Sequence, residues 1–389
     1  MPFVREVHHR TIPLAARVYD ASLGYEHLTL SLIAVEVGEV RDGKPVVGYG
    51  ISPIGWHAPA GVLEQRLIPR LLALPDDELL DGRSGEPDPL LALGAVLADE
   101  PPGSNGECSV AAATLEMALW DVGAKLAEQP LAQLLAERFS RGRRAAAVEV
   151  VAAGGFYRTD VELPLSSEIQ RLRGRGYAAL EIRVGGAELS DDLDAVASGI
   201  ATLGDPGLLA VNAGCALDID RAAAYAEALT DLELRWFAEA GDPLDYEMFE
   251  ELTEIYDPPL AAGSRLLAFG ETDNLLRYSA LRPGYDLLML DPAACGLSIQ
   301  LAVRDLLPEY GWTALSLIAA GGQPLYALQV AAGLGLGGSI AMPATFAPFG
   351  DLGDDVRLID GNAELPDAPG IGFETHSELM AVLRGTLGS

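Results

Sequence analysis

The feature that most constrains the fold is a series of short apolar runs that alternate with amphipathic helical stretches in the second half of the chain. Each run has the length of a strand buried on both faces, which is typical of a parallel β-sheet flanked by helices. Eight runs recur at intervals of roughly 20 to 32 residues, and eight β/α units close naturally into a barrel. The runs are 147–153, 179–184, 208–213, 234–240, 266–271, 287–291, 314–319 and 339–342.

The residues before this series read as an α+β unit. The strand-like segments 30–37 and 46–51 flank Asp42-Gly43, a dipeptide typical of tight turns, and this pattern predicts a β-hairpin. Segments 61–74 and 108–137 have the apolar spacing of helices, and Gln129-Pro130 interrupts the second. We therefore expect an α+β domain over residues 1–140 and a barrel over residues 141–354.

Charge and composition narrow the class of partner. The formal net charge of −31 disfavours nucleic acid and anionic membrane surfaces, because their phosphates would be repelled. The 3 cysteines are too few and too scattered for a disulfide framework. No stretch of eighteen apolar residues occurs, and the first residues lack the layout of a signal peptide. We expect a cytoplasmic protein with neither a nucleic-acid nor a membrane partner.

Two residue types are missing from the region where a barrel would carry its chemistry. No lysine occurs from Leu126 to Ser389, and no histidine occurs between Ala58 and Thr375. Lysine and histidine are the usual proton-transfer groups of such a scaffold, because their pKa values can be placed near neutrality. The barrel must therefore use other groups or catalyse nothing.

Several motifs identify a family resemblance. They are AAATLEMALWD at 111–121, EAGDPLD at 239–245, AAGLGLGG at 331–338 and the tail LPDAPGIGFE at 365–374. Together they resemble the mandelate racemase/muconate lactonizing type of the enolase superfamily, and within it the D-tartrate dehydratase-like acid-sugar dehydratases. The resemblance implies a (β/α)7β modified TIM barrel preceded by an α+β capping domain, with segment 355–389 returning to that domain. It also implies a carboxylate or sugar-acid ligand and a homo-oligomer.

The resemblance further implies a definite reaction. In such enzymes a base removes the proton α to a carboxylate, and Mg²⁺ stabilises the enediolate that forms. Three carboxylates at the ends of the third, fourth and fifth strands hold the metal. A Lys-x-Lys pair ends the second strand, and an Asp–His dyad spans the sixth and seventh.

The metal positions of the family are mostly substituted in this chain. They correspond to Asn212, Ala238 and Glu271. Glu239 is adjacent to Ala238, but neighbours on a strand point to opposite faces, so we expect that it does not substitute for the lost ligand. The sequence therefore predicts a degenerate metal site and no cofactor, although the family would imply Mg²⁺.

The proton-transfer positions are also substituted. Glu181 and Arg183 stand where the family has its lysine pair, and an arginine stays protonated. Asp291 matches the dyad carboxylate, whereas Ala319 or Ala320 replaces the histidine. One hypothesis is that Arg183 pairs with Glu271 and occupies the place of the metal.

Two further groups are candidates for proton transfer. Tyr326 follows the seventh predicted strand, and His27 lies in a loop, 20–29, that would cover the barrel mouth. The catalytic candidates are thus Glu181, Arg183, Asp291, Tyr326 and His27, and the candidates for substrate binding are Asn212, Glu239 and Glu271.

Two functions of different classes remain open. The first is a non-canonical or inactive homologue of the acid-sugar dehydratases that has lost Mg²⁺-assisted proton abstraction and serves as a binding, regulatory or structural protein. The second is an enzyme recruited to metal-independent lyase, isomerase or cyclase chemistry in the same pocket. Loss of charge at Asn212 and Ala238 favours the first, and gain of charge at Glu181 and Arg183 favours the second.

Overall fold

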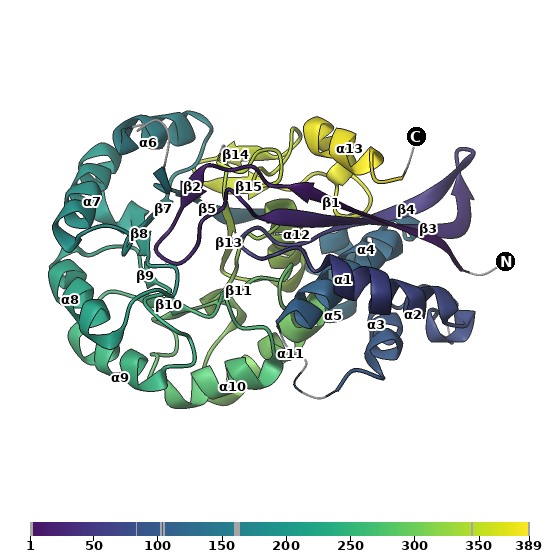
Figure 1. Cartoon of the computed structure of the whole chain (residues 1–389), viewed down its shortest axis with the longest axis horizontal. Coiled ribbons are helices and arrows are strands. Elements are labelled where there is room, and N and C mark those ends of the chain that lie inside the picture. Colours follow the sequence, from purple (N-terminus) through teal and green to yellow (C-terminus); the bar gives the residue numbers. More distant parts are fainter. Residues whose placement is uncertain are drawn as a thin grey trace.

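The computed structural model describes residues 3–82, 84–101, 103, 106–158, 164–343 and 345–387. Within these residues eight parallel strands form a closed barrel, because the last strand pairs with the first. Figure 1 shows the barrel strands inside a ring of helices, with a separate antiparallel sheet and its helices to one side. The predicted fold class, a (β/α)7β barrel with an α+β capping domain, is confirmed.

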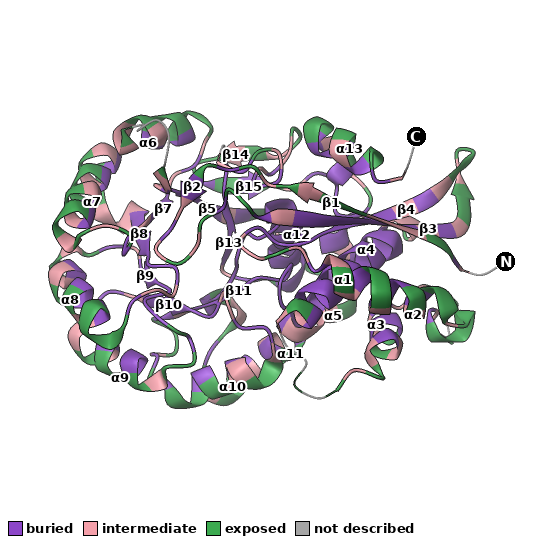
Figure 2. Cartoon of the chain, viewed as in Figure 1, coloured by how far each residue is buried: buried purple, intermediate pink, exposed green. Residues whose placement is uncertain are grey.

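The barrel repeats one unit, a short buried strand followed by a helix. Its strands are β5 (Ala147–Gly154), β7 (Leu180–Arg183), β8 (Leu209–Asn212), β9 (Phe237–Ala238), β10 (Leu260–Ala262), β11 (Leu287–Leu290), β12 (Leu317–Ala319) and β13 (Gly338–Ala341). The intervening helices are α6 (Leu165–Gly174), α7 (Leu189–Leu203), α8 (Ile219–Leu229), α9 (Tyr246–Ile255), α10 (Phe269–Tyr278), α11 (Leu297–Leu306) and α12 (Pro324–Leu334). Figure 2 shows buried strands inside and exposed residues on the outer faces of the helices, as the apolar runs require.

One predicted strand was wrong. The fifth strand is Leu260–Ala262, whereas segment 266–271 forms the approach to α10 and its first turn. Asp257, Pro258 and Pro259 precede the true strand, so its apolar run is short and follows turn-forming residues. This error misplaces every residue assigned to the fifth strand end.

The described part of the capping domain consists of a three-stranded sheet and a group of helices. The sheet order is β1 (Val4–Pro13), β3 (Thr29–Arg41), β4 (Lys44–Ile51), and the predicted hairpin is confirmed, with Asp42 and Gly43 both at positive φ in its turn. The helices are α1 (Ala60–Val62), α2 (Ile68–Ala73), α3 (Pro89–Leu97), α4 (Glu107–Leu126) and α5 (Leu131–Phe139). A β-carbon at Gly48 or Gly50 would collide with the backbone of α4, so these glycines let the sheet approach the helix closely.

The C-terminal segment joins the two parts. The strands β14 (Arg357–Ile359) and β15 (Asn362–Glu364) extend the sheet beside β5, and α13 (Ser377–Arg384) follows. The Ile371 amide donates to Asp121 of α4 at 2.7 Å. A small ribbon, β2 (Val18–Tyr19) with β6 (Tyr157–Arg158), links the cap to the barrel. The exact division at residues 140 and 354 stays a prediction.

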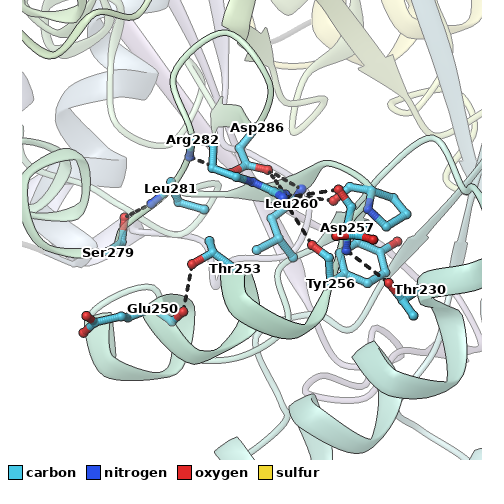
Figure 3. Close-up of polar contacts among 11 residues, drawn as sticks. Thr230, Glu250, Thr253, Tyr256, Asp257, Leu260, Ser279, Leu281, Arg282 and Asp286 are labelled. Carbon is cyan, nitrogen blue, oxygen red and sulfur yellow. Dashed lines mark hydrogen bonds and ion pairs between the residues drawn. The ribbon is translucent and has the colours of Figure 1, made fainter.

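The end of the barrel opposite the mouth is fastened by an ion pair (Figure 3). Asp286, just before β11, accepts hydrogen bonds from the Leu260 amide at 2.8 Å and from Arg282 Nη2 at 2.7 Å. The same Arg282 atom donates to the Pro258 carbonyl at 2.9 Å. The pair therefore holds the starts of β10 and β11 together. Within the described part of the chain, no helix is both long and apolar enough to cross a membrane.

Candidate active site at the barrel mouth

Five of the predicted residues converge at the C-terminal ends of the barrel strands. Glu181, Arg183, Asn212, Glu239 and Asp291 all line one cavity of about 90 Å³. The C-terminal ends of the strands form the active-site face of such barrels, so this cavity is the candidate active site.

Glu181 is the centre of a buried hydrogen-bond network. Its Oε1 accepts from Arg183 Nη1 and from Asn212 Nδ2, both at 3.0 Å, and its Oε2 accepts from Trp236 Nε1 at 3.0 Å. The Arg183 guanidinium also lies 4.7 Å from the ring centre of Phe156. The hypothesis that Arg183 pairs with Glu271 is therefore wrong, because its partner is Glu181, two residues away on the same face of β7.

Glu239 points into the cavity, contrary to the expectation from strand alternation. Strand β9 ends at Ala238, and Glu239 has a φ of 50°, so the two-residue alternation no longer applies. Its Oε2 accepts from the Cys215 thiol at 2.9 Å, and its Oε1 accepts from the Ser264 amide at 2.8 Å. Burial raises the pKa of the Glu239 carboxyl. Burial and the Glu239 charge together raise the pKa of the Cys215 thiol.

Asp291 and Arg265 provide opposite charges in the same cavity. Burial raises the pKa of Asp291 to about 7, and the opposing effects of the Ala293 amide, Arg265 and the Gly322 amide are smaller. Arg265 is half-buried; its Nη1 donates to the Gly55 carbonyl at 3.0 Å. The mouth thus holds a carboxyl group that changes its charge near neutral pH close to a permanent cation.

The capping domain supplies the rest of the mouth. Trp56 stacks on Arg265, with 5.2 Å from the guanidinium carbon to the ring centre. The Tyr25 hydroxyl donates to Asp20 Oδ2 at 2.7 Å. Burial raises the pKa of Asp20, whereas the charge of Arg183 and the hydrogen bonds from Tyr25 and Ser22 lower it. The lowering effects are larger together, so the pKa of Asp20 lies below its ordinary value.

Three candidates lie outside the cavity. Glu271 belongs to the first turn of α10, where its Oε2 accepts from the Leu267 and Ala268 amides at 2.8 and 3.0 Å. It was assigned to the mouth because the fifth strand was misplaced. Tyr326 is fully buried within α12, and His27 is exposed on its loop. Ala238 lies within β9, where it is fully buried.

Sequence reasoning missed Arg265, Trp56, Asp20 and Tyr25. Arg265 follows the true fifth strand, and only the short run 260–262 after Pro258-Pro259 could have indicated it. The other three come from capping loops, whose contact with the barrel has no periodic signal in sequence. The lid loop itself was predicted, but Tyr25 rather than His27 reaches the mouth.

The fold and the mouth define a class of protein, a capped β/α barrel with ionisable groups at its strand ends. Comparison with known proteins identifies the family. Residues 165–379 match the enolase C-terminal domain-like family, and residues 95–136 match the mandelate racemase/muconate lactonizing enzyme N-terminal domain. The chain therefore belongs to the mandelate racemase/muconate lactonizing group of the enolase superfamily, as the motifs predicted.

Similar proteins include sugar-acid enzymes. The chain is 27% identical to L-talarate/galactarate dehydratase of Salmonella typhimurium over 77% of this chain and 72% of that protein. It is also 27% identical to 3,6-anhydro-alpha-L-galactonate cycloisomerase of Streptomyces coelicolor, over 72% of this chain and 74% of that protein. A crystal structure of a racemase from S. coelicolor with bound magnesium shares the fold, with a TM-score of 0.74, 24% identity and coverage of 97% and 99% of the two chains.

These findings correct the expectation that no cofactor is involved. Magnesium is bound in the S. coelicolor racemase structure. A solved variant of L-talarate/galactarate dehydratase contains magnesium and L-glucarate (TM-score 0.74, 24% identity, coverage of 96% and 90%). Mg²⁺ is therefore the ion that the family implies.

The side chains at the relevant strand ends can be compared with what Mg²⁺ requires. Asn212 ends β8, Glu239 follows β9, and Ser264 follows β10 by two residues. Their side chains carry an amide, a carboxylate and a hydroxyl, respectively. All three contain oxygen, but both Glu239 oxygens and the Asn212 oxygen accept internal hydrogen bonds. Among the described residues, no three His, Cys, Asp or Glu side chains form a group that could hold a metal ion. As placed, these residues do not form a magnesium site.

Proposed function

We propose that the barrel mouth binds a small sugar acid and catalyses proton transfer of the lyase or isomerase type with carboxyl groups in place of lysine and histidine. The observation that carries the proposal is the cavity in which Asp291, with a pKa of about 7, lies near Arg265. Dehydratases and cycloisomerases of sugar acids among the relatives support the substrate class.

Each residue has a distinct role in this proposal. Arg265 pairs with the substrate carboxylate, because the charge of Arg183 is already balanced by Glu181. Glu239 and Asp291 act as base and acid: one removes the proton α to the carboxylate, and the other protonates the departing hydroxyl, which leaves as water. Burial raises the pKa of the Glu239 carboxyl above its ordinary value, and it raises the pKa of Asp291 to about 7, which suits Asp291 to carry a proton near neutral pH.

Calorimetric titration with a panel of four- to six-carbon sugar acids in the presence of Mg²⁺ tests the binding step. We expect at least one ligand to bind, and R265Q to weaken its binding by on the order of 10²-fold, the equivalent of one charge-assisted contact. The matched control is R304Q, because Arg304 lies on outer helix α11 and pairs with the exposed Asp305. Equal affinity in R265Q and wild type would contradict the role of Arg265.

A second candidate function is binding without catalysis. It is favoured by the network around Glu181, whose polar groups are bonded to Arg183, Asn212 and Trp236 and need no ligand partner. A ligand that binds in the calorimeter but is recovered unchanged after long incubation would select this function. Homo-oligomerisation and a cytoplasmic location remain predictions, and size-exclusion chromatography with light scattering tests the first.

A further inference from the structure

The charged side chains that line the mouth are unevenly divided between the two signs. They comprise 2 arginines, Arg183 and Arg265, and 4 carboxyl groups, those of Asp20, Glu181, Glu239 and Asp291. With every group ionised the lining carries a net charge of −2, and with Glu239 and Asp291 both protonated the charges cancel. The mouth therefore has no excess of positive charge to attract an anion, and a ligand carboxylate depends on one particular cation.

Arg183 is not that cation, because its charge is already neutralised. Its Nη1 donates to Glu181 Oε1 at 3.0 Å, its side chain is only 9% exposed, and its guanidinium carbon lies 4.7 Å from the ring centre of Phe156. Asp20, whose pKa lies below its ordinary value despite burial, supplies a second negative charge that interacts with Arg183. A ligand carboxylate beside Arg183 would be repelled by the carboxylates of Asp20 and Glu181.

Arg265 is the cation that remains available. It is half-buried, its Nη1 donates to the Gly55 carbonyl at 3.0 Å, and its guanidinium stacks on Trp56. Among the described residues, no carboxylate lies within ion-pair distance of it. Its other N–H groups can therefore bind one ligand carboxylate, in the bidentate geometry that a guanidinium favours.

The other charged groups of the mouth can only accept hydrogen bonds when they are ionised. Asp20 Oδ1 accepts from the amides of Ser22 and Leu23, both at 2.8 Å, and Glu239 and Asp291 also accept from backbone amides. A carboxylate oxygen has room for a second donor, so each of these groups can accept a further hydrogen bond from a ligand hydroxyl. A second ligand carboxylate has no proton to donate and would be repelled.

We propose that the mouth selects sugar acids with a single carboxylate, which Arg265 binds, and disfavours sugar acids with a carboxylate at each end. This inference rests on the proposed function, because it specifies which sugar acids the mouth accepts. The hydroxylated end of the ligand donates to the carboxyl groups of the mouth and must be uncharged.

Ligands that share one carbon skeleton separate the effect of charge from that of shape. Galactitol, D-galactonate and galactarate carry no, one and two carboxylates on the same hydroxylated carbons. The D-glucitol, D-gluconate, D-glucarate series and the D-arabinitol, D-arabinonate, D-arabinarate series give the same comparison with other stereochemistry. Each series is titrated calorimetrically into wild type, once with free Mg²⁺ and once with EDTA. In at least one series we expect the monoacid to bind about 10-fold or more tightly than both the alcohol and the diacid, in both buffers.

A neutralising variant tests whether the charge of the mouth causes this preference. D20N removes a negative charge near Arg183, and the asparagine oxygen can still accept from the Ser22 and Leu23 amides. We expect D20N to narrow the preference for the monoacid over the diacid by about 3- to 10-fold. The matched control is D88N, because Asp88 also accepts from the amides two and three residues ahead but does not line the mouth. D88N should leave the preference unchanged, whereas R265Q should remove the advantage of the monoacid over the alcohol.

The outcomes distinguish this inference from the proposed function. A diacid that binds as tightly as the corresponding monoacid in either buffer would overturn the selectivity but uphold the binding of sugar acids. Absence of binding in all three series would overturn both. An equal narrowing of the preference in D20N and D88N would overturn the assignment of selectivity to the charges of the mouth.

Discussion

At the scale of single residues, Gly322 is the position that most closely determines where the Asp291 carboxyl lies. A β-carbon there would collide with Asp291 Oδ2 and would come 2.7 Å from Pro53 Cβ of the capping domain. We expect G322A to destabilise the protein by about 1–3 kcal/mol, the usual result of overpacking, and to abolish ligand turnover by displacing Asp291. Urea denaturation and the sugar-acid assay measure the two effects.

The control for this substitution is another glycine in the same chain. Gly94 lies on an exposed face of α3, and nothing would touch a β-carbon at that position. G94A should stabilise the helix by about 0.5–1 kcal/mol and leave turnover unchanged. A G322A protein as stable and active as G94A would contradict the packing described for Asp291.

Glu116 should make stability depend on pH. Burial raises the pKa of its carboxyl to about 7 from an ordinary value of 4.5, so the folded state keeps a proton that the unfolded state has released. The resulting stabilisation is complete below pH 4.5 and is lost as the pH rises through 7. Over this pH range the free energy of unfolding of wild type should fall by about 3 kcal/mol relative to that of E116Q, because the glutamine cannot titrate. Urea denaturation of both proteins across this range is the measurement, and a constant difference would show that Glu116 does not hold its proton in the folded state.

Residue identities at the mouth were only partly predictable. Glu181, Arg183, Asn212 and Asp291 were found because each lies in or directly after a strand whose pattern is plain. Glu239 was found but wrongly expected to point away, because a residue of positive φ at a strand end does not obey alternation.

At the scale of elements, the Arg282–Asp286 pair fastens β10 to β11 at the end of the barrel away from the mouth. Asp286 is fully buried and accepts from the Leu260 amide, so its removal leaves a buried donor without a partner. We expect D286A to cost about 3 kcal/mol of folding free energy, measured by urea denaturation, without changing ligand affinity in the folded protein.

An exposed aspartate provides the comparison for that prediction. Asp305 pairs with Arg304 at the surface of α11, and D305A should cost less than about 1 kcal/mol. If D286A and D305A were equally stable, the pair at the base of the barrel would have no structural role.

The elements themselves show where pattern recognition succeeds. Seven of the eight predicted runs overlap an observed barrel strand, since parallel strands buried on both faces leave a continuous apolar run. The prediction of the fifth strand failed because Leu260–Ala262 is only 3 residues long. The apolar residues after it belong to the segment that leads into α10.

At the scale of the whole molecule, the mouth exists only because two domains meet. Gly55 and Trp56 from the cap contact Arg265 from the barrel, and Tyr25 and Asp20 close the same cavity opposite Arg183. Such contacts join residues far apart in the chain, so no local pattern predicts them. The family resemblance predicted that the domains would meet, and the structure identifies the residues that do so.

The central claim is that carboxyl groups at this mouth move protons to and from a sugar acid. Proton NMR of the sugar-acid panel in D₂O, with enzyme and Mg²⁺, measures this directly as loss of the signal of the proton α to the carboxylate, with or without a dehydrated product. We predict loss of that signal for at least one sugar acid with wild type, and a rate lower by roughly 10²- to 10⁴-fold with D291N, the usual contribution of one acid–base group. An unchanged signal for every sugar acid, including any that binds, would contradict the claim.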